Sequence, residues 1–130
     1  MKKNIIFGAS GLIGKSFYNL LNKKNNFFFF SKSDQKFKTF DLNKNLKKFP
    51  IKEVDICFFC ASPRINQHNL RKNLFNQEYT WLENVISNIK INKLIYLSSS
   101  SVYYHSNHKI GKIKKKCENY IIKNKNKFLN

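Results

Sequence analysis

Three glycines near the start of the chain, Gly8, Gly11 and Gly14, have the spacing of a loop that holds phosphate groups. An apolar run precedes them, and a helical pattern of apolar residues follows them. In such a unit one glycine permits a tight turn, one lets a pyrophosphate approach the backbone, and one lets the helix pack closely. The alternative is a strand-to-helix turn that binds nothing. The loop residues that we expect to contact a dinucleotide are Gly8, Ser10, Gly11, Leu12, Ile13 and Gly14.

A second polar group, Ser31, Lys32 and Asp34, follows the apolar run at residues 27–30. In a parallel sheet, ligands bind at the carboxyl ends of strands, and an acid at this place would bind the ribose hydroxyls of NAD. The hydroxyl of Ser31 and the ammonium of Lys32 suit a 2′-phosphate instead. These residues therefore favour NADP over NAD, with Asp34 as the partner in the NAD alternative.

Serines at positions 98–101 follow a later apolar run, where a hydroxyl could polarise a substrate carbonyl. The alternative is a polar loop that leaves the sheet.

Cys57 and Cys60 form a C-x-x-C pair within an apolar, strand-like run. Strand side chains alternate between faces, so positions three apart point to opposite sides. We therefore expect buried strand cysteines rather than a redox or metal pair. His105, His108 and Cys117 match no standard metal-site spacing, and no metal site is expected.

The elements that must position these residues alternate between strand and helix patterns, with continuous apolar runs typical of strands buried on both faces. This alternation predicts an α/β fold: a Rossmann-like, doubly wound parallel sheet of about five strands in a single domain. The expected strands are 3–7, 27–30, 37–40, 55–60 and 94–97, and the expected helices are 12–23, 43–48, 68–90 and 109–124.

The chain has 130 residues, which suits one domain, and a formal net charge of +18. Because the lysines are spread along the whole chain, we interpret the charge as compositional and expect no specific nucleic-acid binding. A basic nucleic-acid-binding protein remains the alternative that the charge alone suggests. No apolar stretch approaches the length of a membrane span, so we expect no membrane partner and a cytoplasmic protein.

Five segments in order resemble the extended short-chain dehydrogenase/reductase superfamily, the NAD(P)-dependent epimerases and dehydratases of nucleotide sugars. GASGLIG resembles its glycine loop, VDICFFCAS its fourth strand, and LIYLSSSSVY its fifth strand with a Ser/Thr-x-x-Val-Tyr motif. Asn76, four residues before Thr80, resembles the asparagine that opens its central helix. Asp41 and Leu42 resemble its Asp-Leu pair. The resemblance implies that Asp41 contacts adenine and that Ala61 lies beside the cofactor.

The resemblance also implies catalytic residues. Ser99 takes the position of the family's catalytic hydroxyl, and Lys114 takes the lysine of its Tyr-x-x-x-Lys pair, which also holds the nicotinamide ribose. The tyrosine position is occupied by Ile110, which cannot transfer a proton. Neither Tyr103 nor Tyr104 has a lysine four residues later.

The resemblance therefore predicts an NAD(P)-binding domain over residues 1–122, a frayed basic tail over 123–130, and no C-terminal substrate-binding domain. Catalysis by the chain alone is doubtful, so a non-catalytic dinucleotide-binding module or a gene remnant is the alternative to an enzyme. A nucleotide sugar would then bind only with a partner chain. Trp81 fits either a face that pairs two copies into a homodimer or the core.

Overall fold

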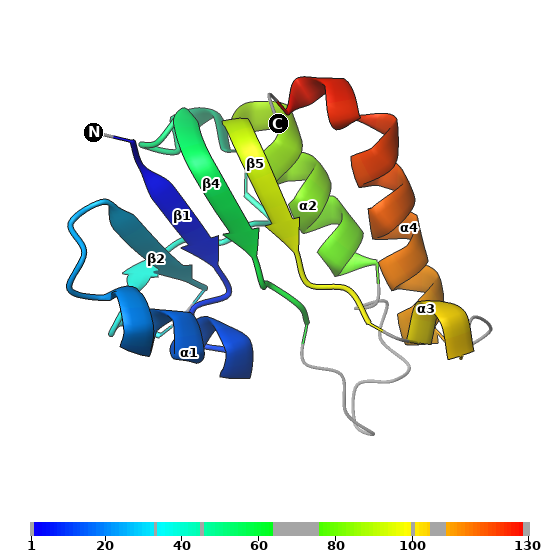
Figure 1. The fold of residues 1–130 in the computed structure, drawn as a ribbon, viewed down its shortest axis with the longest axis horizontal. Helices are drawn as coiled ribbons and strands as arrows, with labels where there is room; N and C mark the ends of the chain where they lie inside the picture. The colour runs from blue at the N-terminus through cyan, green and yellow to red at the C-terminus, as the bar shows by residue number, and fades with distance from the viewer. Residues whose placement is uncertain are drawn as a thin grey trace.

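The computed structural model describes residues 2–32, 34–44, 46–63, 76–99, 101–104 and 109–128. Within these ranges, a five-stranded sheet has the order β3-β2-β1-β4-β5, and every neighbouring pair is parallel. The expected Rossmann-like α/β sheet is therefore confirmed (Figure 1). The strands are β1 Asn4–Phe7, β2 Phe27–Ser31, β3 Lys38–Thr39, β4 Glu53–Phe59 and β5 Lys90–Tyr96.

Helices cover both faces of the sheet, as a doubly wound fold requires. Helix α1 packs on one face, and α2 and α4 pack side by side on the other (Figure 1). The helices are α1 Leu12–Leu21, α2 Gln77–Asn88, α3 Ser101–Tyr104 and α4 Lys109–Lys123, with 3₁₀ turns η1 Leu46–Lys48 and η2 Lys125–Lys127.

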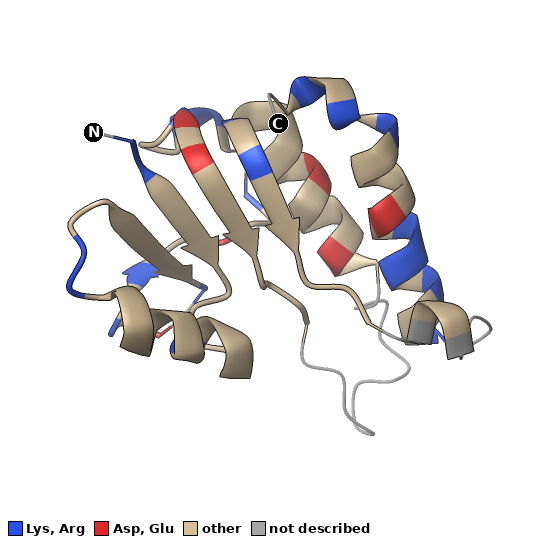
Figure 2. Ribbon diagram, viewed as in Figure 1, with Lys and Arg blue, Asp and Glu red and all other residues tan. Residues whose placement is uncertain are grey.

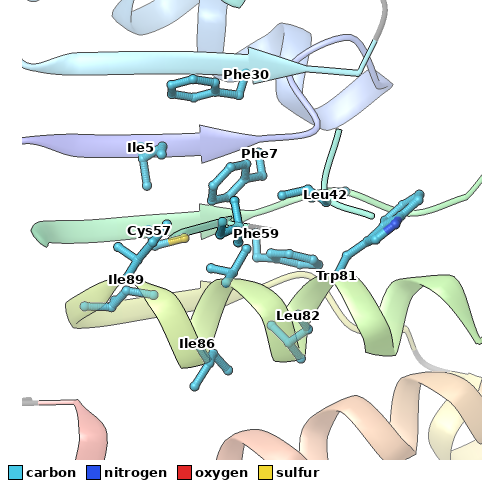
Figure 3. Close-up of a cluster of buried hydrophobic side chains, with 14 of the residues drawn as sticks. Ile5, Phe7, Phe30, Leu42, Cys57, Phe59, Trp81, Leu82, Ile86 and Ile89 are labelled. Carbon is cyan, nitrogen blue, oxygen red and sulfur yellow. The ribbon is translucent and has the colours of Figure 1, made fainter. Parts of the chain in front are cut away.

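The continuous apolar runs bury both of their faces, as predicted. In β1, Ile5 and Phe7 belong to the larger core cluster, which includes Leu82 and Ile86 of α2 (Figure 3). Ile6 points the other way, into a smaller cluster against α1. Alternate side chains of a strand face opposite sides, so a run without polar residues is needed when both sides are covered.

Cys57 and Cys60 lie on opposite faces, as expected, but only Cys57 is a buried strand residue. Cys57 is fully buried in the larger cluster, whereas Cys60 follows the end of β4 and packs half-buried against the smaller one. Burial raises the pKa of the Cys57 thiol far above its ordinary value. The Cys57 thiol is therefore a protonated core group that does not face Cys60.

Element bounds differ from prediction mainly around α2 and β5. Helix α2 ends at Asn88, and β5 begins at Lys90 rather than at residue 94, because Lys90 pairs with Glu53 of β4. The expected helix 43–48 is only the turn η1, and α3 was not expected. Residues 68–75 of the expected central helix fall outside the described residues.

The end of the chain differs from the expected frayed tail. The expected boundary at residue 122 lies inside α4, which ends at Lys123, and η2 begins at Lys125. Phe128 then packs against the larger core cluster. This apolar contact of Phe128 holds the segment after α4 against the domain.

Lysines lie on elements of both layers and are most frequent on α4, which has six among its 15 residues (Figure 2). Among the described residues, no helix is both long enough and apolar enough to cross a membrane.

Candidate functional site

A cleft of about 510 Å³ opens at the carboxyl ends of β1, β2 and β4. This is the edge where parallel α/β sheets bind ligands. The cleft brings together residues that are far apart in the sequence. The predicted site residues that line it are Gly8, Ser10, Gly11, Ser31, Lys32, Leu42 and Ala61.

The backbone of the loop requires glycine at two positions. Gly8 has φ +84°, and a Cβ there would lie 2.7 Å from the backbone nitrogen of Ala61. A Cβ at Gly14 would lie 2.1 Å from the Gly8 carbonyl oxygen, so α1 approaches the loop at a distance that a side chain would prevent. At Gly11 the nearest atom would be 3.4 Å away, which leaves the backbone open toward the cleft.

The first turn of α1 has positive charge and no acidic residue. Its first backbone bond runs from the Lys15 N–H to the Gly11 carbonyl, 2.9 Å, so the N–H groups of Leu12, Ile13 and Gly14 precede the regular helical pattern. Lys15 itself lines the cleft. A lysine at the positive end of a helix is unfavourable in isolation. A bound anion would be stabilised both by the Lys15 ammonium and by the N–H groups at the start of α1.

Ser31 and Lys32 have different environments. Ser31 is buried; its hydroxyl donates to Ser10 Oγ at 3.0 Å and accepts the Asp34 N–H at 3.4 Å. Ser31 therefore ties the end of β2 to the glycine loop. Lys32 is exposed at the cleft, and Asp34 also lines it.

Trp81 forms part of the cleft wall and of the core, 9% exposed. Its indole Nε1 donates to Asn43 Oδ1 at 2.7 Å, and its side chain extends toward Leu42 (Figure 3). The core interpretation of Trp81 is therefore correct. Asp41 does not line the cleft; its Oδ1 accepts the Asn43 N–H at 2.9 Å, which shapes the turn after β3.

Lys114 belongs to a group that we call the Glu78 cluster, in which Glu78 and Cys117 are buried and Tyr96 and Lys114 are partly buried. The Lys114 ammonium lies 2.9 Å from Glu78 Oε1 and 3.0 Å from the Leu97 carbonyl oxygen. Tyr96 donates its hydroxyl proton to Glu78 Oε2 at 2.5 Å. Glu78 is 1% exposed, so Lys114 balances a carboxylate that has little access to water.

The thiols and the phenol around Lys114 stay protonated. Burial and the Glu78 carboxylate raise the pKa of Tyr96 far above its ordinary value, so Tyr96 is no substitute for a tyrosine acid/base. Burial raises the pKa of Cys117 to about 11. Burial also raises the pKa of Cys60 to about 11, against the opposing effect of the Lys114 ammonium. Cys60 lines the cleft, whereas Lys114 lies outside its lining, at the same end of the sheet.

The other predicted catalytic position lies between β5 and α3. Ser99 is partly buried, and its carbonyl accepts the Val102 N–H at 3.1 Å. The neighbouring Ser98 donates to Glu118 Oε1 at 2.6 Å. Ile110 is half-buried in the first turn of α4. The side chain of Tyr104, together with His105 and His108, lies outside the described residues.

No protein-family model and no curated protein matches the sequence. Solved structures do match. A UDP-N-acetylglucosamine 4-epimerase from Bacillus cereus has a TM-score of 0.67 and 18% identity, over 98% of this chain and 51% of that one. A GDP-mannoheptose C4 reductase from Campylobacter jejuni with NADP bound has a TM-score of 0.68 and 20% identity, over 93% and 44%. A UDP-glucuronic acid 4-epimerase from Bacillus cereus in complex with NAD has a TM-score of 0.61 and 19% identity, over 91% and 50%.

The chain has the fold of these epimerases and reductases. The fold implied by the sequence resemblance is therefore confirmed. At 20% identity or less, the likeness concerns the fold and leaves activity open. The chain spans about half the length of these structures, 44% to 51%.

Sequence reasoning missed several residues of the site, among them two lining residues and one that contacts Lys114. Lys15 and Trp81 line the cleft, and Glu78 holds Lys114. Glu78 had a detectable signal: it lies four residues before Leu82 and seven before Val85, on the apolar side of α2. An acid on a buried helix face requires a basic partner. Among the described residues, no group of His, Cys, Asp and Glu side chains could hold a metal ion.

Proposed function

We propose that this chain binds a nicotinamide dinucleotide in the cleft, with the pyrophosphate against the glycine loop and the start of α1. The observation that carries the proposal is the combination at one edge of the sheet: bare backbone at Gly11, a helix start without acids, and two lysines, Lys15 and Lys32. Backbone N–H groups and ammonium groups together bind phosphate. The apolar part of the cleft, with Leu42 and Trp81, suits adenine.

We further propose that NADP is preferred to NAD, because Lys32 is the exposed charged group beside the end of β2. Its ammonium suits the 2′-phosphate, whereas Ser31 supports the loop through Ser10. Asp34, at the same cleft, is the group that would favour NAD instead.

We infer that the chain is a homologue of nucleotide-sugar epimerases, dehydratases and reductases that does not turn over substrate unaided. Ile110 replaces the acid/base tyrosine that the resemblance implies, and the Tyr96 hydroxyl is bonded to Glu78. Ser99 and Lys114 remain as proposed polarising and ribose-holding groups, with a nucleotide sugar bound only when a partner chain completes its site.

Calorimetric titration of the protein with NADPH and with NADH tests the proposal. We expect NADPH to bind more tightly, and Lys32→Ala to weaken NADPH about tenfold while changing NADH less than about twofold, since a charge-assisted hydrogen bond is lost. Lys24→Ala, at an exposed turn after α1, removes the same charge and should change neither. No binding of either dinucleotide at millimolar concentration would refute the dinucleotide site, and a preference for NADH would refute the role of Lys32.

A further inference from the structure

The Glu78 cluster joins three elements at the edge of the sheet that also carries the cleft. Glu78 comes from the first turn of α2, Lys114 from α4 and Tyr96 from the end of β5. The Lys114 side chain is 13% exposed and that of Glu78 is 1% exposed. A charged pair this deep is costly unless its geometry is well satisfied.

The ammonium of Lys114 has three protons, and the structure accounts for two acceptors. Glu78 Oε1 lies 2.9 Å away and the Leu97 carbonyl oxygen 3.0 Å away. Leu97 follows the last residue of β5, so both acceptors hold Nζ at the carboxyl end of the sheet. Among the residues that the structure describes, these are the two hydrogen-bond acceptors of the ammonium, which leaves its third N–H for a ligand.

Glu78 is itself held in place on its other side. Its Oε2 accepts the Tyr96 hydroxyl at 2.5 Å and faces Cys117 Sγ at 3.8 Å. The two carboxylate oxygens thus have separate partners. The hydrogen bonds to Oε2 hold the carboxylate in place, and Oε1 holds the Lys114 ammonium. Because the carboxylate is held in this way, the Glu78 side chain has little rotamer freedom, and its bond to Lys114 restricts where the ammonium can lie.

We propose that Glu78 is a positioning residue that fixes the Lys114 ammonium so that its remaining N–H meets the nicotinamide ribose of the bound dinucleotide. This inference rests on the proposed dinucleotide site and extends it to a residue outside the cleft lining. Glu78 touches no part of the ligand and acts only through Lys114.

The test compares two ligands that share the adenosine end and differ at the nicotinamide end, NADPH and 2′,5′-ADP. Calorimetric dissociation constants are measured for wild type, Glu78→Gln and Glu78→Asp. We expect both variants to weaken NADPH by about tenfold, the effect of losing one hydrogen bond to a charged group, and to leave 2′,5′-ADP within about twofold. A purely structural role would weaken both ligands together.

Glu53→Gln is the matched control, because it makes the same change in the exposed Glu53–Lys90 ion pair, 3.5 Å apart, at the opposite end of β4 and β5. It should leave the ratio of the two dissociation constants unchanged. If Glu78→Gln does not fold, Glu78→Asp, which keeps the charge and shortens the reach, decides by the same ratio.

If the ratio of the NADPH and 2′,5′-ADP dissociation constants is the same in the Glu78 variants as in wild type, the positioning role is refuted, whereas the proposed dinucleotide site is not. Failure of wild type to bind either ligand refutes the proposed function itself, and the positioning role with it. If wild type prefers NADH, the pair NADH and ADP replaces the first pair, with the same expected ratio.

Discussion

The glycine loop and the Glu78 cluster lie at the same edge of the sheet, but backbone shapes the loop and buried side chains shape the cluster. In the loop, Gly8 and Gly14 matter because no Cβ fits there. In the cluster, Glu78 and Lys114 matter because each balances the other away from water. The loop is a local motif within one strand–helix unit, whereas the cluster joins residues up to 39 positions apart.

The comparison teaches that the two regions fail in different ways. A side chain added to the loop meets backbone atoms that cannot move aside, so the cost is steric. A side chain removed from the cluster leaves a buried charge, so the cost is electrostatic. Substitutions in each region can therefore separate the two causes.

The largest effect is expected at Lys114. Lys114→Met leaves the Glu78 carboxylate buried without its cation and should lower the free energy of unfolding by about 4 kcal/mol. Urea denaturation followed by circular dichroism measures this loss. The double variant Glu78→Gln with Lys114→Met removes both charges and should regain most of the stability. A Lys114→Met protein within about 1 kcal/mol of wild type would contradict the electrostatic account.

A smaller steric effect is expected at Gly8. Gly8→Ala combines a positive φ with a Cβ 2.7 Å from the Ala61 nitrogen, and should cost about 3 kcal/mol of stability. Gly11→Ala is the matched control, because its Cβ would be 3.4 Å from the nearest atom. That variant should unfold within about 1 kcal/mol of wild type and yet bind NADPH at least tenfold more weakly, because the methyl group occupies the phosphate's approach. Equal destabilisation by Gly8→Ala and Gly11→Ala would contradict the view that glycine is sterically required at Gly8 and not at Gly11.

The smallest effect concerns the thiol in the Glu78 cluster. Cys117 has a folded pKa of about 11, above the ordinary value of 9.0. Above pH 9 the unfolded chain releases this proton while the folded chain retains it, so the stability present below pH 9 is lost as pH rises toward 11. The loss should reach up to about 2 kcal/mol, and Cys117→Ala should show a correspondingly shallower decline between pH 9 and 11. Parallel declines in the two proteins would show that Cys117 contributes nothing to it.

The sequence predicted the loop side well because its signals are local. Glycine spacing, a preceding apolar run and a following helical pattern lie within residues 4–21, and β1 and α1 appear there. Ser31 and Lys32, at the end of the apolar run 27–30, also line the cleft, and so does Leu42, which the resemblance indicated.

The side of the sheet with β5 and the Glu78 cluster depends instead on contacts between residues that are distant in the sequence. Lys90, Asn92 and Lys93 are polar and gave no strand signal, yet β5 begins at Lys90 because it pairs with β4. Asn92 donates to Asp55 Oδ1 at 3.2 Å across that pairing. The role of Glu78 needed the relative placement of α2 and α4, which the helical patterns alone do not give.

Trp81 is the single tryptophan of the chain and stands in the wall of the cleft, with its indole nitrogen bonded to Asn43. Emission excited at the long-wavelength edge of the indole absorption, where the six tyrosines absorb little, therefore originates at one place in the molecule. A reduced nicotinamide absorbs in the range where a buried indole emits, so resonance energy transfer would report its arrival, while an adenosine fragment without that chromophore would alter the emission only through local polarity. The proposed site thus contains an intrinsic fluorophore that would distinguish a bound nicotinamide dinucleotide from an adenosine fragment without a label.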